Sequence, residues 1–223
     1  MAQNIASLVS NNKDSSASNA SDKHASATTS SDLSSISDIK NKLDRYFDSG
    51  ATKSLSWRKR QLSAFLTLLQ TEEKAIADAL HKDLNKSPEE AFLTETGYLI
   101  KDVKYLLKHV EKWMKPVNKS TPLLAFPAKS MVRAEPLGTC LVIGAWNYPF
   151  QLSLSPMLAA IAAGNCVIVK PSELAQATSS LIARLLPKYL DMNAIAVVEG
   201  GKEPTSALLE LPYGKIFYTG GEQ

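Results

Sequence analysis

The sequence predicts an α/β fold in which N-terminal helices are followed by a doubly wound parallel sheet. Four short apolar runs occur after residue 138, each bounded by Gly, Pro or Asn, as in strands buried on both faces. Helix-like segments near 153–163, 175–190 and 204–210 separate these runs. A regular alternation of strand and helix is typical of a parallel sheet. The predicted strands are residues 140–143, 167–169, 195–198 and 215–218.

The first 38 residues differ in composition from the rest of the chain. Twelve of them are serine, most of the others are Ala, Asn, Asp or Thr, and no aromatic residue precedes Tyr46. Such a segment buries too little apolar surface to offset the entropy of ordering it. We therefore predict a disordered tail over 1–38, a helical region with a crossing segment over 39–135, and a sheet domain over 136–223.

Three amphipathic patterns with helical spacing follow the predicted tail. A short one covers 36–48 and ends before Gly50. The second has its apolar residues three and four positions apart and continues past Thr71, where a separate helix is expected to start. Its apolar residues are Leu62, Phe65, Leu66, Leu69, Ile76, Leu80 and Leu84.

The third helix is predicted to begin at Ser87. Serine is a favourable N-cap, Pro88 fits the first turn, and Glu90 at the third helical position completes a capping box. Pro116 ends the helix, and residues 116–134, with three prolines, are predicted to be an irregular crossing segment. The buried stripe is expected to contain Leu99, Val103, Leu106, Leu107, Val110 and Met114.

No charged residue or histidine occurs from Pro136 to Val169, a run of 34 positions. A membrane-spanning helix needs about 20 uninterrupted apolar residues. Polar residues, prolines and a glycine interrupt this run, and two strands flanking a helix explain it with every interruption at a connection. The interrupting residues are Asn147, Pro149, Pro156, Gly164 and Asn165.

Composition restricts the function classes. The net charge of +3 is too small to indicate a nucleic-acid partner, and the basic run 57–60 is interpreted as a solvated helix face. Three scattered histidines offer no metal-ligand spacing, so no metal site is expected. Two cysteines, Cys140 and Cys166, do not form a disulfide framework and suit a reducing compartment. We therefore expect a cytoplasmic protein, with no membrane anchor visible in this chain.

Polar or glycine-rich loops follow all four predicted strands, at the edge where open parallel sheets bind ligands. Asn147 could donate to an oxyanion or simply form a turn. Lys170 could contact ribose or phosphate or be a solvated strand end, and Glu173 could accept from ribose hydroxyls or begin the next helix. Gly201 and Gly220 could admit a cofactor or form ordinary turns.

Taken together these motifs resemble a known family. The segments GAWNYPF, AAGNCVIVKPSE, VVEGG and IFYTGG, in this order and spacing, are similar to the N-terminal part of aldehyde dehydrogenases. The helical segment from Asp83 to Pro116 resembles the class 3, fatty-aldehyde branch. The resemblance covers roughly residues 38–221. It implies a Rossmann-like NAD(P)-binding domain, here truncated before the catalytic domain.

The resemblance implies oxidation of an aldehyde, expected to be of medium or long chain, to a carboxylic acid with NAD or NADP. In this family a cysteine thiolate attacks the aldehyde, an asparagine amide holds the oxyanion, and a glutamate activates water to hydrolyse the thioester. Asn147 resembles the oxyanion asparagine. The other implied contacts are Ala145 and Trp146 beside the nicotinamide, Lys170 and Glu173 at the adenosine ribose, and Gly201 and Gly220 at close backbone approaches.

Glu173 would repel a 2′-phosphate, which favours NAD, although the class 3 branch often accepts both cofactors. The family's nucleophilic cysteine and base glutamate lie beyond the matched segments. Cys140 and Cys166 are at strand starts, opposite the ligand edge, and are interpreted as core thiols. We therefore expect this chain to be inactive alone, and full-length family members to be homodimers.

Two alternatives from other classes remain. The chain could be a non-catalytic nucleotide-binding or regulatory fragment, which predicts saturable NAD binding. It could instead be a non-functional truncated product, which predicts aggregation through an uncovered sheet edge. A short-chain Rossmann dehydrogenase would need a G-x-G-x-x-G turn after its first strand, and Gly138 and Gly144 do not supply one.

Overall fold

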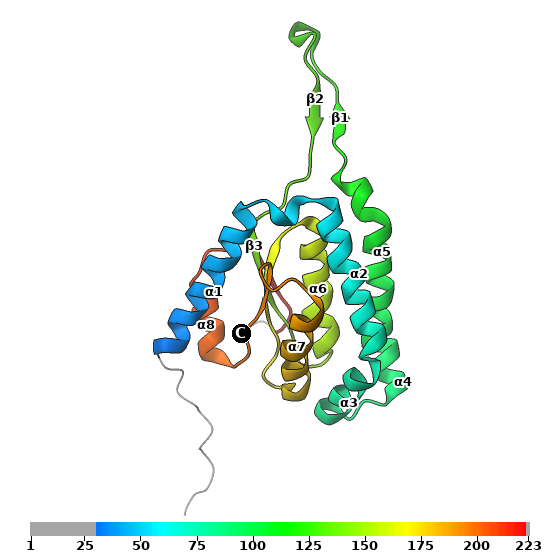
Figure 1. The fold of residues 1–223 in the computed structure, drawn as a ribbon, viewed down its shortest axis with the longest axis vertical. Helices are drawn as coiled ribbons and strands as arrows, with labels where there is room; N and C mark the ends of the chain where they lie inside the picture. Colours follow the sequence, from blue (N-terminus) through cyan, green and yellow to red (C-terminus); the bar gives the residue numbers. More distant parts are fainter. Residues whose placement is uncertain (1–29, 222–223) are drawn as a thin grey trace, which may run out of the picture.

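The computed structural model describes the backbone of residues 30–221 and the side chains of residues 35–221. Its centre is a four-stranded sheet in the order β5-β4-β3-β6, with helices on both faces (Figure 1). All three strand pairings are parallel, which confirms the predicted α/β fold class. The strands are β3 (Thr139–Ile143), β4 (Cys166–Lys170), β5 (Ile195–Val197) and β6 (Lys215–Tyr218).

Three helices connect these strands: α6 (Pro149–Ala163), α7 (Gln176–Tyr189) and α8 (Lys202–Leu209). α6 contacts α7 on one face of the sheet, whereas α8 contacts α1 (Ser30–Asp48), which itself contacts β3 and β4. The chain moves outward from β3 to β4 and β5 and then returns to β6 on the other side of β3. The strand order therefore reverses between β3 and β6, the position at which doubly wound sheets bind ligands.

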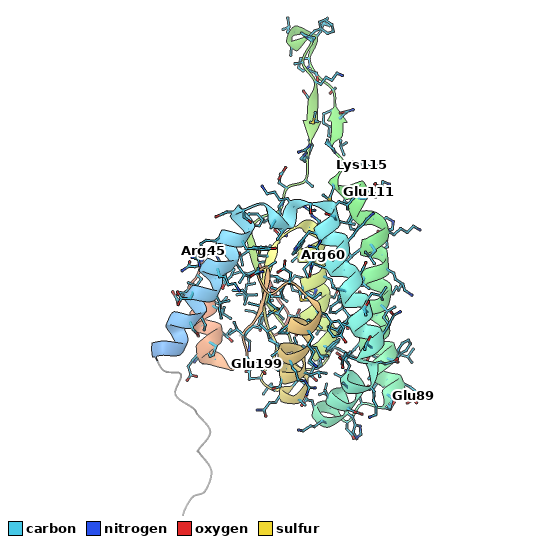
Figure 2. The ribbon with its side chains drawn as sticks, viewed as in Figure 1. Arg45, Arg60, Glu89, Glu111, Lys115 and Glu199 are labelled. Carbon is cyan, nitrogen blue, oxygen red and sulfur yellow. The ribbon has the colours of Figure 1, made fainter. Side chains whose placement is uncertain are left out.

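An outer helical layer covers α6 and α7. It consists of α2 (Leu55–Thr71), α3 (Glu73–Leu84), α4 (Pro88–Ala91) and α5 (Gly97–Met114). The predicted break after Thr71 and the predicted cap at Ser87 are both confirmed, since the Ser87 hydroxyl accepts from the Glu90 N–H at 3.2 Å. A five-residue π-helical turn, Phe92–Thr96, lies between α4 and α5. Glu89 of α4 lies at the lower end of this helical layer, and Glu111 and Lys115 lie at its upper end (Figure 2).

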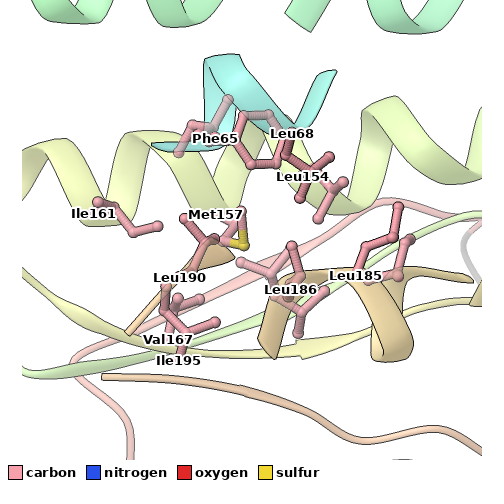
Figure 3. Packing of buried hydrophobic residues seen from close by; sticks show 14 of the residues in the cluster. Phe65, Leu68, Leu154, Met157, Ile161, Val167, Leu185, Leu186, Leu190 and Ile195 are labelled. Atoms are coloured by element: carbon pink, nitrogen blue, oxygen red, sulfur yellow. The ribbon is translucent and has the colours of Figure 1, made fainter. Parts of the chain in front are cut away.

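The hydrophobic core joins the outer helices to the sheet. Phe65 and Leu68 of α2 lie above Met157 of α6, which in turn lies above Val167 and Ile195 of the sheet (Figure 3). All five side chains are completely buried. One continuous cluster contains residues from both sides of position 135. The helical region and the sheet therefore pack around a single core.

The helix α1 begins at Ser30, earlier than the predicted residue 36. Residues 30–38 of the predicted tail are therefore helical, and that part of the prediction is wrong. The rest of the predicted tail, residues 1–29, lies outside the described residues. Ile36 is buried against the core, so this segment has an apolar anchor although its serine content alone predicted disorder.

The prediction of an irregular crossing segment over 116–134 is also wrong. Residues 117–119 (β1) and 130–132 (β2) pair as an antiparallel ribbon, which projects from the end of α5 as an arm (Figure 1). The three prolines of this segment lie before β1 or in the connection between the strands, where they interrupt no ladder hydrogen bond. We refer to residues 116–134 as the arm.

The strand β6 also differs from the prediction that all four strands are buried on both faces. β3 and β4 are fully buried, but all four residues of β6 are exposed. β6 is the edge strand next to β3, so only one neighbour covers it. Within residues 30–221, no helix combines the length and the apolar character needed to cross a bilayer. β3, α6 and β4 confirm the strand–helix–strand interpretation of 136–169, but Pro156 lies inside α6 and not at a connection as predicted.

Candidate functional site

The carboxyl ends of the parallel strands open onto one pocket of about 670 Å³. Parallel register brings these ends together: the Gly144 N–H donates to the Lys170 carbonyl at 3.0 Å, and the Thr219 N–H donates to the Ile143 carbonyl at 3.1 Å. All seven site residues predicted from the sequence line this pocket. They are Ala145, Trp146, Asn147, Lys170, Glu173, Gly201 and Gly220.

Lys170 forms a fixed cationic centre at the end of β4. Its ammonium group donates to the Glu173 carboxylate at 3.0 Å and to the Gly200 carbonyl at 2.7 Å. The Lys170 side chain is almost fully buried, whereas that of Glu173 is about half exposed. These two bonds connect the loops after β4 and β5, so the two loops form a single rigid wall.

The Glu173 carboxylate is an available hydrogen-bond acceptor. Partial burial raises its pKa, but hydrogen bonds from its own backbone N–H and from Lys170, together with the charge of Lys170, lower the pKa by more. Glu173 is therefore ionised at neutral pH. Its Oε2 atom accepts from Lys170, and its Oε1 atom accepts from no other residue within 35–221. A ligand hydroxyl could occupy that position.

Two glycines keep the pocket wall open. A Cβ atom placed on Gly201 would lie 3.8 Å from Cγ of Glu173 and would extend beside the carboxylate. A Cβ atom on Gly220 would lie 2.1 Å from the Tyr218 hydroxyl oxygen, which donates to the Gly221 carbonyl at 3.1 Å. A side chain at Gly220 would therefore displace the ring of Tyr218, which is exposed and can move aside.

Residues 144–148, here called the rim loop, follow β3. Trp146 and Asn147 are exposed at the pocket, and Ala145 is half-buried. Within residues 35–221 the Asn147 carboxamide has no hydrogen-bond partner, although its backbone carbonyl accepts from Lys86 at 3.0 Å. The amide NH2 of Asn147 can therefore donate to a ligand oxygen without first breaking a protein contact.

Several pocket residues were not predicted from the sequence. The pocket also contains Ser172, Leu174, Lys202, Thr205, Ser206 and Tyr218. No local pattern in the sequence distinguished these six residues from ordinary residues of turns and helix starts, so none of them alone indicated a ligand site. Glu95 was missed as well, although it lies four positions before Leu99 and continues the predicted apolar stripe backward. A carboxylate within a buried apolar stripe indicates a paired and informative residue, because glutamate is rarely buried without a partner.

The two thiols are unsuited to nucleophilic chemistry. Burial raises the pKa of Cys140 to about 11, opposed by the charge of Lys215. Burial, with smaller contributions from nearby carboxylates, raises the pKa of Cys166 to about 12. Both cysteines are free and buried, and neither lines the pocket. Among the side chains that the structure describes, no group of three His, Cys, Asp or Glu residues is arranged to hold a metal ion.

Comparison with known proteins places this geometry in context. The sequence profile of the aldehyde dehydrogenase family matches residues 10–223. Aldehyde dehydrogenase family 3 member H1 of Arabidopsis thaliana is 46% identical over 187 residues, which are 84% of this chain and 39% of that protein. The 4,4'-diaponeurosporen-aldehyde dehydrogenase of Staphylococcus aureus is 44% identical over 177 residues, which are 79% of this chain and 39% of that protein.

A solved structure shows the same architecture. The substrate-bound state of Staphylococcus aureus AldH superposes with a TM-score of 0.80 and 41% sequence identity. The matched region covers 82% of this chain and 40% of that one. The chain thus spans about two fifths of the length of the proteins that it matches here.

Proposed function

The chain belongs to the aldehyde dehydrogenase family, and from this premise we propose that it forms the NAD(P)-binding and oxyanion-stabilising part of an aldehyde-oxidising enzyme. The observation that carries the proposal is the single pocket that gathers Asn147, Lys170 and Glu173 at the point where the strand order reverses. A free amide donor, an anchored ammonium group and an ionised carboxylate are the groups that an aldehyde oxyanion and a ribose require.

The pocket residues fit a dinucleotide. The Oε1 atom of Glu173, which accepts from no other described residue, can accept from a ribose hydroxyl, and Gly201 leaves the neighbouring wall free of a side chain. Bound NAD or NADP would supply the hydride acceptor. The role of this chain is to orient the cofactor through Lys170 and Glu173, and to stabilise negative charge on the aldehyde oxygen through the Asn147 amide.

We further propose an apolar aldehyde of medium or long chain as the substrate class. The support is family membership in the class 3 branch and the name of the Staphylococcus aureus relative, a diaponeurosporen-aldehyde dehydrogenase. A cytoplasmic location is proposed from the two buried free thiols. Oxidation of a homologous series of aldehydes by a protein that joins this chain to a complete catalytic region would test the chain-length preference.

Nucleotide binding tests the central proposal. We expect wild-type protein to bind NAD saturably in calorimetry, and Lys170→Met to weaken binding about 10- to 100-fold, because a buried charge-assisted anchor is lost. Glu173→Gln should weaken NAD binding less and should improve the affinity for NADP relative to NAD, since it removes the charge that repels a 2′-phosphate.

Glu199→Gln is the matched control for these variants. Glu199 follows β5 and accepts from the hydroxyls of Ser179 and Ser180, but it does not line the pocket. Its affinity for NAD should equal that of wild type. Absence of saturable NAD binding to folded wild-type protein would contradict the proposal, and aggregation of the wild type would favour the non-functional alternative.

We also propose that the 223-residue chain has no dehydrogenase activity alone. Neither thiol reaches the pocket, and raised pKa values keep both protonated at neutral pH. We expect no NADH formation from NAD and a long-chain aldehyde, and no modification of Cys140 or Cys166 by a thiol reagent until the protein unfolds. Turnover above a no-protein blank, or rapid labelling of native protein, would show this proposal to be wrong.

The arm supports a proposal that the protein associates with a second copy. Leu123, Leu124 and Phe126 at its tip are all at least 81% exposed. Apolar side chains of this size are rarely left in water unless they bind another surface. We expect wild type to sediment as a dimer and the double variant Leu124→Glu/Phe126→Glu as a monomer, so a monomeric wild type would count against the proposal.

A further inference from the structure

A buried ion pair lies directly behind the rim loop. Lys86 is 6% exposed, Glu95 is 0% exposed, and the Lys86 ammonium group donates to Oε1 of Glu95. Lys86 precedes α4, and Glu95 lies in the π-helical turn. Neither residue lines the pocket. Burying two charges is unfavourable unless each is paired and hydrogen-bonded, so their other contacts are informative.

The Glu95 carboxylate caps the helix that follows the rim loop. Its Oε2 atom accepts from the N–H groups of Phe150 at 2.8 Å and Gln151 at 3.1 Å. The local sequence cannot provide this cap, because Tyr148 occupies the N-cap position without a side-chain bond and Pro149 has no N–H. A carboxylate from a distant element therefore fixes the start of α6, where the helix dipole also favours negative charge.

The Lys86 ammonium group fixes the rim loop itself. It donates to the backbone carbonyl of Asn147 at 3.0 Å and lies 4.2 Å from the centroid of the Tyr148 ring. The orientation of the peptide group between Asn147 and Tyr148 is thereby determined. Because the Asn147 side chain has no hydrogen-bond partner among the described residues, these backbone contacts are what determine the position of its amide.

The π-helical turn that carries Glu95 is itself a specialised feature. Gly97 closes it by donating to the Phe92 carbonyl, and a Cβ atom on Gly97 would lie 2.7 Å from that oxygen. Single π-turns within helices are often found at functional sites. The turn contacts α6, and it places Glu95 where its carboxylate meets the first free N–H groups of that helix.

We propose that Lys86 and Glu95 are positioning residues that hold the rim loop so that the Asn147 amide faces the pocket. This inference rests on the proposed function, since it deepens the role assigned to Asn147. A neutral side chain would cap α6 without burying a charge, and buried ion pairs contribute little to stability relative to apolar residues. The pair instead connects the Asn147 carbonyl within the loop and the Phe150 and Gln151 N–H groups after it to one element.

The proposal can be tested with the chain as it exists by fluorine NMR of 5-fluorotryptophan-labelled protein. The chain has three tryptophans, of which only Trp146 lies in the rim loop. In Lys86→Met, we expect the Trp146 resonance to shift or broaden while those of Trp57 and Trp113 stay unchanged. Amide exchange at Phe150 and Gln151 should rise about tenfold in Glu95→Gln, because the cap is weakened.

Lys40→Met is the matched control. Lys40 is 5% exposed, pairs with Asp44 and lies over the Tyr213 ring, so it is a second buried lysine that contacts a carboxylate and a tyrosine ring. It lies at the other end of β3, since Asp44 accepts from the hydroxyl of Thr139. Lys40→Met should leave the Trp146 resonance at its wild-type position even though it removes a comparable buried lysine.

The double variant Lys86→Met/Glu95→Gln avoids an unpaired buried charge and guards against loss of folding. A folded Lys86→Met or double variant with an unchanged Trp146 resonance would overturn the proposal. Failure of both variants to fold, while Lys40→Met folds, would overturn it as well by assigning the pair to stability. Addition of NAD to the wild-type protein is a separate measurement. A Trp146 resonance that does not respond to NAD would contradict nucleotide binding, whereas the position of the rim loop is tested by comparing the free wild type with the free variants.

Discussion

Gly144→Ala is expected to lower the free energy of unfolding by about 3 kcal/mol, because it overpacks the contact between β3 and α6. A Cβ atom on Gly144 would lie 2.1 Å from Oγ of Ser153, 3.1 Å from its Cβ and 3.2 Å from its Cα. Two of these atoms are close to or part of the α6 backbone, so a side-chain rotation cannot remove the clash. The helix or the rim loop must move.

Ser153 provides the test of this mechanism. Its buried hydroxyl has no hydrogen-bond partner among the described residues, so Ser153→Ala alone should change the free energy of unfolding little or raise it. In the Ser153→Ala background, Gly144→Ala should cost at least about 1 kcal/mol less, because the nearest clash is gone. Rescue should be partial, since the contacts to Cβ and Cα of residue 153 remain.

Urea denaturation of the two single variants and the double variant measures this coupling. Gly221→Ala is the control, because a Cβ atom there meets no atom within 4 Å, and its effect should stay within about 0.5 kcal/mol. Additive effects of the Gly144 and Ser153 substitutions would contradict the steric explanation. A displaced α6 would also carry the rim loop with it, so NAD binding by Gly144→Ala should weaken together with stability.

Much of the sheet and of the pocket follows from local sequence patterns. Short apolar runs bounded by turn residues predicted the four strands within one residue of their observed bounds. Once the strands are parallel, their carboxyl ends must share one edge, and the loops that follow them meet there. This is why Asn147, Lys170 and Glu173 could be predicted to lie together without knowledge of any distance.

Other features depend on contacts between distant residues. Lys86 is 61 positions from Asn147 and Glu95 is 55 positions from Phe150, and their pairing depends on a π-turn that no local pattern predicted. β6 is exposed because it lies at the edge of the sheet. The sequence did not predict this exposure, because β6 is an apolar run like the buried strand β3. The arm was missed since its strands are only three residues long and its prolines dominate the composition.

Asp191→Asn is expected to lower the free energy of unfolding by about 2 kcal/mol at neutral pH, since it removes a half-buried charge-assisted network. The Asp191 carboxylate accepts from the hydroxyl of Tyr46 at 2.7 Å, the indole of Trp57 at 3.0 Å and the amide groups of Asn193 at 3.1 Å. Its backbone N–H donates to Gln61 at 2.9 Å. These contacts join α1 and α2 to the turn before β5, where Asp191 itself is half-buried.

The isosteric replacement is severe for a specific reason. Trp57 is 3% exposed, and its indole N–H donates to the Asp191 carboxylate. In Asp191→Asn this N–H would either face the donor NH2 of the amide or bond to a neutral amide oxygen, which is a weaker acceptor than a carboxylate. An unsatisfied buried N–H costs about 1–3 kcal/mol. Asp78→Asn is the control, because the pair of Asp78 with Lys74 is highly exposed and should contribute less than about 1 kcal/mol.

The effect of Asp191→Asn should depend on pH in a defined direction. Partial burial raises the pKa of Asp191, but hydrogen bonds from Trp57, Tyr46 and Asn193 outweigh it, so the folded-state pKa lies below 3.8. A carboxyl group with a lowered folded-state pKa contributes stability above its unfolded-state pKa and loses that contribution as pH falls through the folded-state value. The free energy of unfolding of the wild type should therefore exceed that of Asp191→Asn most at neutral pH. The difference between the two free energies should narrow at pH values below 3.8.

Denaturation curves of both proteins from neutral pH to about pH 3 would measure this difference. Comparing the two proteins at each pH cancels the titration of other carboxylates with lowered pKa values, such as Glu111 and Glu173. A difference that stays constant on acidification would mean that the ionised form of Asp191 is not what Tyr46 and Trp57 recognise. Asp191 contacts α1 on one side of the sheet and α2 on the other. A narrowing difference would therefore show that the ionised Asp191 carboxylate stabilises the packing of these two helices.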